Sequence, residues 1–298
     1  MPLLVSPPKR WGASIAELTS SNKIVLYGGK SVDNSAFYGL LSDTWTWNGT
    51  AWTFVGSNQP PGARFDAGMA YDGTKVTMIG GSDGHQILTD SWSFNGTTWT
   101  QNALGTNLFA LMSQGMTYLS GSTEDIMFGG RSFIGHYVTD TFVWQSPSTL
   151  MKLTTTSNPP GRADFCFASS ATIAVLFGGL NFDGPLSDTW TFNGTTWTKV
   201  TTATTPQARS GACMVYDATH TQWVLFGGKT TDSFNNETWT FNGTTWTNAT
   251  PATSPAGRAE AMMAFDSTHG NVVMFGGRGY NTVYGDTWIW NGTTWTAQ

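Results

Sequence analysis

The chain has 298 residues, a formal net charge of −5 and only 11% charged residues. This sparse, acidic charge argues against a nucleic-acid or anionic-membrane partner, and no apolar run approaches the roughly 18 residues of a membrane-spanning helix. The composition is instead rich in glycine, threonine, asparagine and tryptophan, which favours an exported β-protein, although the first ten residues lack the apolar stretch of a signal peptide. The cellular location therefore stays open.

A glycine pair recurs along the whole chain at nearly constant spacing. The pairs begin at Gly28, Gly80, Gly129, Gly178, Gly227 and Gly276, with steps of 52, 49, 49, 49 and 49 residues. A period near fifty residues is typical of β-propeller blades. We therefore expect one domain of six β-units, at about residues 7–58, 59–107, 108–157, 158–205, 206–253 and 254–298.

Each unit is expected to contain four strands, as the fifth unit illustrates. It opens with a proline-containing turn and Arg209, and the small and apolar residues 210–216 indicate a first strand. After a polar turn, residues 223–226 are continuously apolar up to the glycine pair, which is typical of a strand buried on both faces. A variable polar loop then leads to a third strand, and a turn leads to a fourth.

An Asn-Gly pair separates the third and fourth strands in five of the six units. The pairs begin at Asn48, Asn95, Asn193, Asn242 and Asn291. Asparagine and glycine both tolerate positive φ, so we expect type I′ hairpin turns. The Asn-Gly-Thr triplets also match the glycosylation acceptor motif, but turn chemistry alone explains all five. Ten of the fifteen tryptophans flank these turns, and we interpret them as core anchors.

These features together resemble the kelch repeat over essentially the whole chain: an arginine after the opening turn, an apolar run into a glycine pair, Asp-Thr-Trp, and a second tryptophan after a short gap. The resemblance implies an all-β, six-bladed β-propeller with four antiparallel strands per blade. It also implies a ligand on the face that carries the loops before the first strand and between the second and third strands. Because the sequence runs from a first strand to the fourth-strand Trp295, we expect each blade to be contiguous in sequence.

Two sets of residues depart from the simple pattern. In the third unit Leu111 replaces the arginine and Phe142 replaces the third-strand tryptophan, so that blade is either relaxed or specialised. Cys166 and Cys213 each follow a repeat arginine by four residues and so occupy equivalent places in neighbouring units. Equivalent points on neighbouring blades are usually too far apart for a disulfide, so we expect two free thiols at a space-limited inner position.

The repeat arginines are the first candidates for a binding site. We expect them to surround an axial pocket: Arg10, Arg64, Arg162, Arg209 and Arg258. Guanidinium groups suit carboxylate or phosphate ligands, but they could equally bond backbone carbonyls and acids to join the blades. Two residues later, alternate units carry Asp66, Asp164 and Glu260. In a strand, residues two apart point the same way, so ion pairs between these acids and the arginines are expected.

The three acids have a second interpretation. Carboxylates on alternate blades would face one another around the axis, where they could hold a hard cation or keep one acid protonated as a general acid. Asp66 and Asp164, together with His85 and His136 from the loops after the second strands, could form a mixed metal site. No spacing motif supports such a site, and the sequence does not require a metal.

The same loops carry aromatic residues, among them Tyr38, Tyr137 and Tyr284. Aromatic rings beside arginines and aspartates on a rigid scaffold suit a polar ligand with apolar faces, such as a sugar or a peptide. The alternative is that most of these rings fold back onto their own blades.

Two functions of different classes follow. The first is a monomeric binding module that holds a polar or anionic small molecule, a glycan or a peptide above the arginines. The second is an enzyme, either a phospho- or carboxyl-ester hydrolase or a mutarotase- or epimerase-type catalyst. It would use Asp66, Asp164 or Glu260 as acid or base and the arginines as oxyanion stabilisers.

The family resemblance does not decide between them. Kelch-type propellers include copper-radical oxidases, sialic-acid mutarotases and iron-dependent specifier proteins. A copper-radical enzyme would need a cysteine crosslinked to a ligand tyrosine, which the repeat positions of Cys166 and Cys213 do not suggest.

Overall fold

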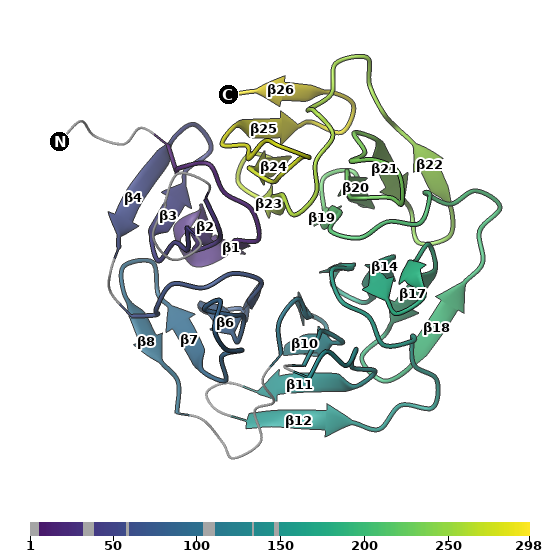
Figure 1. Ribbon diagram of the computed structural model, residues 1–298, viewed down its shortest axis with the longest axis horizontal. Coiled ribbons are helices and arrows are strands. Elements are labelled where there is room, and N and C mark those ends of the chain that lie inside the picture. Colours follow the sequence, from purple (N-terminus) through teal and green to yellow (C-terminus); the bar gives the residue numbers. More distant parts are fainter. Residues whose placement is uncertain (1–5, 32–38, 58–59, 104–110, 133, 146–148) are drawn as a thin grey trace.

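Six β-sheets surround a central axis in the computed structural model (Figure 1). It describes residues 6–31, 39–57, 60–103, 111–132, 134–145 and 149–298. The chain passes once around the ring, so the first blade lies beside the last. The predicted all-β, six-bladed propeller is confirmed.

Each blade is a four-stranded antiparallel sheet whose strands run in sequence order from the axis to the rim. Blades one to three contain β1 (Ser14–Leu18), β2 (Lys23–Tyr27), β3 (Thr44–Trp47), β4 (Trp52–Gly56); β5 (Gly68–Tyr71), β6 (Val76–Ile79), β7 (Ser91–Phe94), β8 (Trp99–Gln101); and β9 (Gly115–Leu119), β10 (Glu124–Phe128), β11 (Thr141–Gln145), β12 (Thr149–Leu153). Blades four to six contain β13 (Cys166–Ser169), β14 (Ala174–Phe177), β17 (Thr189–Phe192), β18 (Trp197–Val200); β19 (Cys213–Asp217), β20 (Gln222–Phe226), β21 (Thr238–Phe241), β22 (Trp246–Asn248); and β23 (Met262–Asp266), β24 (Asn271–Phe275), β25 (Thr287–Trp290), β26 (Trp295–Ala297). The expectation that each blade is contiguous in sequence is confirmed.

Three short elements lie between these strands. A 3-10 turn, η1 (Thr19–Ser21), joins β1 to β2, and a small hairpin of β15 (Leu180–Asn181) and β16 (Gly184–Pro185) projects from blade four. Within the described residues, no helix is long or apolar enough to cross a membrane.

The apolar core lies between blades rather than within one sheet. The second strand of every blade is buried along nearly all of its length, as its continuous apolar run predicts. One cluster joins Val25 and Tyr27 of blade one to Met78 and Phe94 of blade two. Burying one such side chain contributes about 1.5–3 kcal/mol, so stacking of neighbouring blades supplies most of the stability of the ring.

Repeated hydrogen bonds join each blade to the next and close the ring. The second glycine of each pair donates its N–H to a carbonyl of the following blade, as Gly29 does to Arg64 at 2.8 Å. The same contact joins blade six to blade one, from Gly277 to Arg10 at 2.8 Å. A Cβ on Gly28 would lie 2.5 Å from the Arg64 oxygen, so this approach requires glycine.

The turns between the third and fourth strands differ from the prediction. Strand pairing ends at Trp47 and Trp52, so a four-residue loop connects them, and only Gly49 in it has positive φ. The Asn48 side-chain oxygen accepts the N–H groups of Thr50 and Ala51 at 3.1 and 2.9 Å. The type I′ assignment was therefore wrong, because the asparagine supports the turn through its side chain instead of adopting positive φ itself.

The tryptophans beside these turns are core anchors, as predicted. Those at the start of the fourth strands donate their indole N–H to a threonine of the preceding blade, as Trp246 does to Thr189 at 2.9 Å. Trp52 does the same to Thr287 at 2.9 Å, and this bond spans the closure between blades one and six.

Candidate functional site

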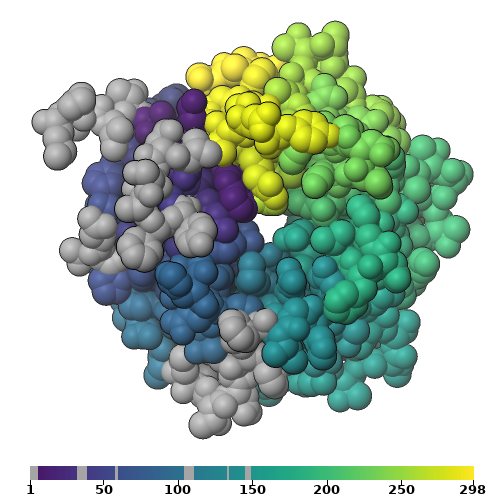
Figure 2. Space-filling view, viewed as in Figure 1, coloured from purple at the N-terminus to yellow at the C-terminus, as the bar shows by residue number. Residues whose placement is uncertain are grey.

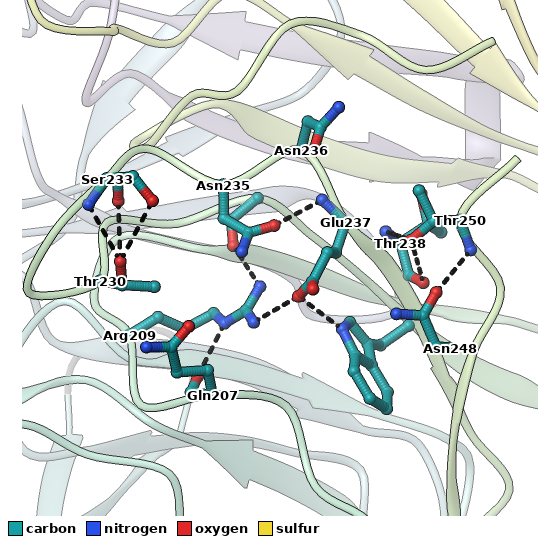
Figure 3. Close-up of polar contacts among 12 residues, drawn as sticks. Gln207, Arg209, Thr230, Ser233, Asn235, Asn236, Glu237, Thr238, Asn248 and Thr250 are labelled. Carbon is teal, nitrogen blue, oxygen red and sulfur yellow. Dashed lines mark hydrogen bonds and ion pairs between the residues drawn. The ribbon is translucent and has the colours of Figure 1, made fainter. Parts of the chain in front are cut away.

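The five repeat arginines are buried inside their own blades, with at most 2% of the side chain exposed. Arg209 shows the pattern in Figure 3: its guanidinium donates to the carbonyls of Gln207 and Gly227, both at 2.9 Å, and to Glu237 at 2.7 Å. Glu237 also accepts the indole N–H of Trp239 at 2.9 Å. Each of the three guanidinium nitrogens thus bonds the protein itself.

The other four arginines repeat this anchor with an aspartate from the Asp-Thr-Trp or equivalent motif. The pairs are Arg10–Asp43, Arg64–Asp90, Arg162–Asp188 and Arg258–Asp286, at 2.5–2.7 Å. Burial alone would raise the pKa of Asp188, but the hydrogen bonds and charge of Arg162 hold that pKa below its ordinary value. The expected arginine-lined axial pocket is therefore wrong: the arginines lie inside the blades and pair with these acids, and not with the acids two residues later.

Those later residues instead form a ring at one mouth of the axial channel. All six have left-handed φ, from 54° to 63°: Gly12, Asp66, Ser113, Asp164, Gly211 and Glu260. Each residue donates its backbone N–H to the carbonyl of the preceding member of the ring. The N–H of Asp66 donates to the Gly12 carbonyl at 2.8 Å, and the N–H of Gly12 closes the ring by donating to the Glu260 carbonyl at 3.1 Å. Four non-glycine residues in this conformation mark a place where strain is tolerated, which is common at functional sites.

The three carboxyl side chains of this ring influence one another. The Ser113 hydroxyl donates to Asp66 at 3.2 Å, and Glu260 forms a bidentate pair with Arg278 at 2.6 and 3.0 Å. Burial, followed by repulsion from Asp164 and Glu260, raises the pKa of Asp66 well above its ordinary value. Burial and the Glu260 charge also raise the pKa of Asp164, against the effects of Ser113, Arg278 and Arg131. The predicted grouping of the three acids around the axis is thus found.

A second set of charged residues lies beside the acids and was missed from the sequence. Four blades place a cation directly after the glycine pair, namely Lys30, Arg131, Lys229 and Arg278. Each cation forms an isolated antiparallel β-bridge with the residue just before a member of the mouth ring, as Lys30 does with Trp11. The signal was readable: a positive charge follows Gly-Gly in four of six repeats of a chain with only fourteen lysines and arginines.

Aromatic rings support three of these cations, and the longest contact is the 6.0 Å between the Lys229 ammonium and the centre of the Phe234 ring. The Lys30 ammonium lies 3.4 Å from the centre of the Phe65 ring and 4.7 Å from that of Trp11, and the Arg278 guanidinium lies 4.6 Å from the Trp11 ring. Burial lowers the pKa of Lys30, while Asp66 and Glu260 oppose this effect. Donors, acceptors and an aromatic face are therefore fixed together around the mouth.

The channel continues inward from this mouth. A cavity of about 200 Å³ begins one residue beyond the mouth ring and is lined by the first residues of the inner strands, including Gly68, Gly115 and Cys213. Figure 2 shows the opening at the centre of the ring. Cys166 and Cys213 are free and buried, and burial raises the pKa of the Cys213 thiol to about 12. Both cysteines border this narrow cavity, as the small residues at their repeat position had suggested.

None of the predicted loop residues is a member of this mouth ring. His85 is exposed and borders a groove of about 510 Å³ that Arg64 and Asp90 also line. His136 is exposed, while the Tyr137 ring meets Phe182 edge-on at 4.9 Å. Tyr284 covers the Arg258 guanidinium at 3.8 Å, and Tyr38 lies outside the described residues.

The metal site considered from the sequence is not assembled. In the part of the chain that the structure describes, no three histidine, cysteine, aspartate or glutamate side chains gather as metal ligands. His85 and His136 come from separate loops and do not join Asp66 and Asp164.

Comparison with known proteins bears on the fold. No family model matches the chain, and no curated protein matches it. Among solved structures, the one titled "Structure of YjhT" superposes with a TM-score of 0.77 over 99% of each chain, at 12% sequence identity. The chain is a six-bladed β-propeller. At this identity the likeness to YjhT shows the shared architecture and nothing of the ligand.

Proposed function

We propose that this chain is a kelch-type propeller that binds a polar, anionic small molecule, such as a sugar acid or the acidic end of a glycan, at the axial mouth. The observation that carries the proposal is the mouth ring itself: Asp66, Asp164 and Glu260 are held at left-handed positions beside Lys30, Arg131 and Arg278. The mouth ring does not need these carboxyl groups for its backbone hydrogen bonds, because Gly12 and Gly211 make the same bonds without a side chain.

The charge balance favours an anionic group on the ligand. Lys30, Arg131 and Arg278 act on the three carboxyls, and Asp66 and Asp164 have raised pKa values that weaken their negative charge. Arg131 is exposed, so its guanidinium is accessible to a carboxylate. The carboxyl oxygens and the Ser113 hydroxyl would bond ligand hydroxyl groups.

An acid–base enzyme acting on the same ligand is the second candidate, and one observation favours it. The raised pKa of Asp66 results from burial and from two neighbouring carboxyls, which is how proteins keep a general acid protonated near neutral pH. In this alternative Asp66 donates a proton, Asp164 accepts one, and the nearby cations stabilise developing negative charge. An epimerase- or mutarotase-type reaction, or ester hydrolysis, fits that arrangement.

Titration of the protein with D-glucuronate and with neutral D-glucose tests the binding proposal, with heat measured by calorimetry. We expect glucuronate to bind more tightly than glucose, and Arg131→Ala to weaken glucuronate binding about tenfold or more. Lys199→Ala is the matched control, because it removes an exposed cation from the outer strand β18. Equal affinity for the two sugars, or equal losses in the two variants, would refute an anion site at the mouth.

The enzyme alternative has its own test. Asp66→Asn retains the shape of the side chain but removes its titrating proton. If the site is catalytic, turnover of a screened ester or sugar substrate falls by about 10²–10⁴-fold in this variant while binding persists. A variant that keeps full turnover would exclude Asp66 as the acid.

A further inference from the structure

The opposite end of the axial channel contains a second cavity, of about 420 Å³. The inner strands run in parallel around the axis from the mouth ring toward this end, so the residues that finish them line it. One repeat position supplies Glu17, Tyr71, Tyr118, Ser169, Tyr216 and Phe265. The cavity therefore contains a ring of aromatic side chains interrupted by one acid and one serine, and we refer to it as the aromatic bowl.

The side chains next to this circle of aromatic residues are apolar and polarisable. Two residues earlier in the strands, the bowl is lined by Met69, Met116, Met214 and Met263, with isoleucine and phenylalanine completing the layer. Thioethers and aromatic rings are polarisable and adapt to irregular apolar groups. This lining contrasts with the charged mouth at the other end of the channel.

The electrostatic character of the bowl is negative. Among the described residues that line it, Glu17 alone carries a formal charge. Its Oε1 accepts the N–H of Ser267 at 2.7 Å, and burial raises its pKa despite that bond. An anionic ligand would therefore be repelled here.

We propose that the aromatic bowl is a second binding site, specific for a small organic cation such as a substituted ammonium group with an apolar body. Aromatic rings attract a cation through their negative faces, and a single carboxylate neutralises its charge. A volume of about 420 Å³ accommodates a ligand of this size. The chemistry is opposite to that of the mouth, so the two sites would hold ligands of opposite charge at the two ends of one channel.

Choline and its neutral isostere 3,3-dimethylbutan-1-ol are suitable probes, because they have nearly the same shape and differ in charge. Titrations followed by NMR of labelled tyrosine rings should show choline shifting Tyr71, Tyr118 or Tyr216, with at least about tenfold weaker binding of the isostere. No shift with choline at tens of millimolar, or equal binding of the isostere, would overturn the proposal.

Two pairs of variants localise the effect. Glu17→Gln should abolish the preference for choline, whereas Glu124→Gln, which removes an equal charge at the start of β10 outside the bowl lining, should preserve it. Ala171 is an exposed lining residue, so Ala171→Lys should weaken choline binding by repulsion and Ala171→Gln should not. If Glu17→Gln and Ala171→Lys both bind choline as the wild type does, the site is elsewhere. These results are independent of glucuronate binding at the mouth.

Discussion

The backbone N–H of Gly12 donates a hydrogen bond to the carbonyl oxygen of Glu260 at 3.1 Å. This bond joins the first blade to the last and completes a ring of six such bonds around the axial mouth. Because the backbone alone makes the ring, the side chains at these positions are free to differ between blades. The protein uses that freedom to place carboxyl groups on alternate blades, where they form part of the proposed binding site.

Glycine in place of Asp164 should relieve backbone strain while it damages the site. Asp164 has a φ of 54°, which costs a residue with a Cβ about 1 kcal/mol or more, whereas Gly211 holds the equivalent position at no such cost. We expect Asp164→Gly to be more stable to urea than Asp164→Ser by about 1 kcal/mol. Both variants should lose affinity for glucuronate. A glycine variant that is less stable than the serine variant would contradict the strain argument.

The buried arginine anchors should matter for stability. Arg162→Ala leaves the largely buried Asp188 carboxylate without its bidentate partner, so we expect a loss of about 3–5 kcal/mol in the free energy of unfolding. Lys152→Ala is the control, because its ion pair with Asp140 is mostly exposed and should contribute less than about 1 kcal/mol. Urea unfolding measures both values. Similar small losses in the two variants would show that the anchors are not structural.

A buried acid on blade three should make stability depend on pH. Asp125 is 1% exposed, neither of its carboxyl oxygens has a hydrogen-bond partner, and burial together with Asp72 raises its pKa to about 8. The folded state therefore holds a proton that the unfolded state releases near pH 4, so stability falls as pH rises from about 4 to about 8. Asp125→Asn should remove this part of the decline.

The measurement is urea unfolding of wild type and Asp125→Asn at pH 5 and at pH 8.5. We expect the variant to gain stability relative to the wild type by a few kcal/mol at the higher pH. A difference between the two proteins that stays constant with pH would show that Asp125 titrates normally.

The closure between blades six and one can be probed with a matched pair of glycines. Gly49 and Gly243 have φ of 96° and 98°, so alanine strains both turns equally. A Cβ on Gly49 would lie 2.0 Å from the His269 ring, which Asp266 holds at 2.9 Å, whereas nothing lies within 4 Å of a Cβ on Gly243. We expect Gly49→Ala to lower the melting temperature more than Gly243→Ala, with a further cost of about 1 kcal/mol.

The double variant Gly49→Ala/His269→Ala supplies the control. Without the His269 imidazole, alanine at position 49 should lower the melting temperature no more than alanine at position 243 does. A Gly49→Ala penalty that persists without the His269 ring would mean that the contact across the closure is not its cause.

The architecture was readable from the sequence because the repeats constrain it six times over. The glycine pairs fix the period, since a Cβ at Gly28 would meet the carbonyl of the next blade. The continuous apolar runs before them locate the buried second strands. The arginines were correctly recognised as equivalent, and their bonding to the protein was one of the two alternatives that the sequence left open.

The partners of those arginines were not predicted, and the reason is local. Residues two apart share a face only in an extended strand, but Asp164 follows Arg162 into a left-handed conformation that turns its carboxyl away. The true partner, Asp188, is 26 residues later and is brought back by the pairing of β14 with β17. Residue spacing does not specify where a side chain points at an irregular backbone position. The sequence therefore predicted one pocket, whereas the arginines lie inside the blades and the three acids lie in the mouth ring.

The central claim is that the axial mouth holds an anionic ligand between its carboxyls and cations. A crystal structure of the protein grown with D-glucuronate tests this claim most directly. We expect density for the sugar at the mouth ring, with its carboxylate within hydrogen-bond distance of Lys30, Arg131 or Arg278 and a hydroxyl on Asp66 or Asp164. Glucuronate bound anywhere else on the propeller, or a mouth left empty at saturating ligand, would contradict it.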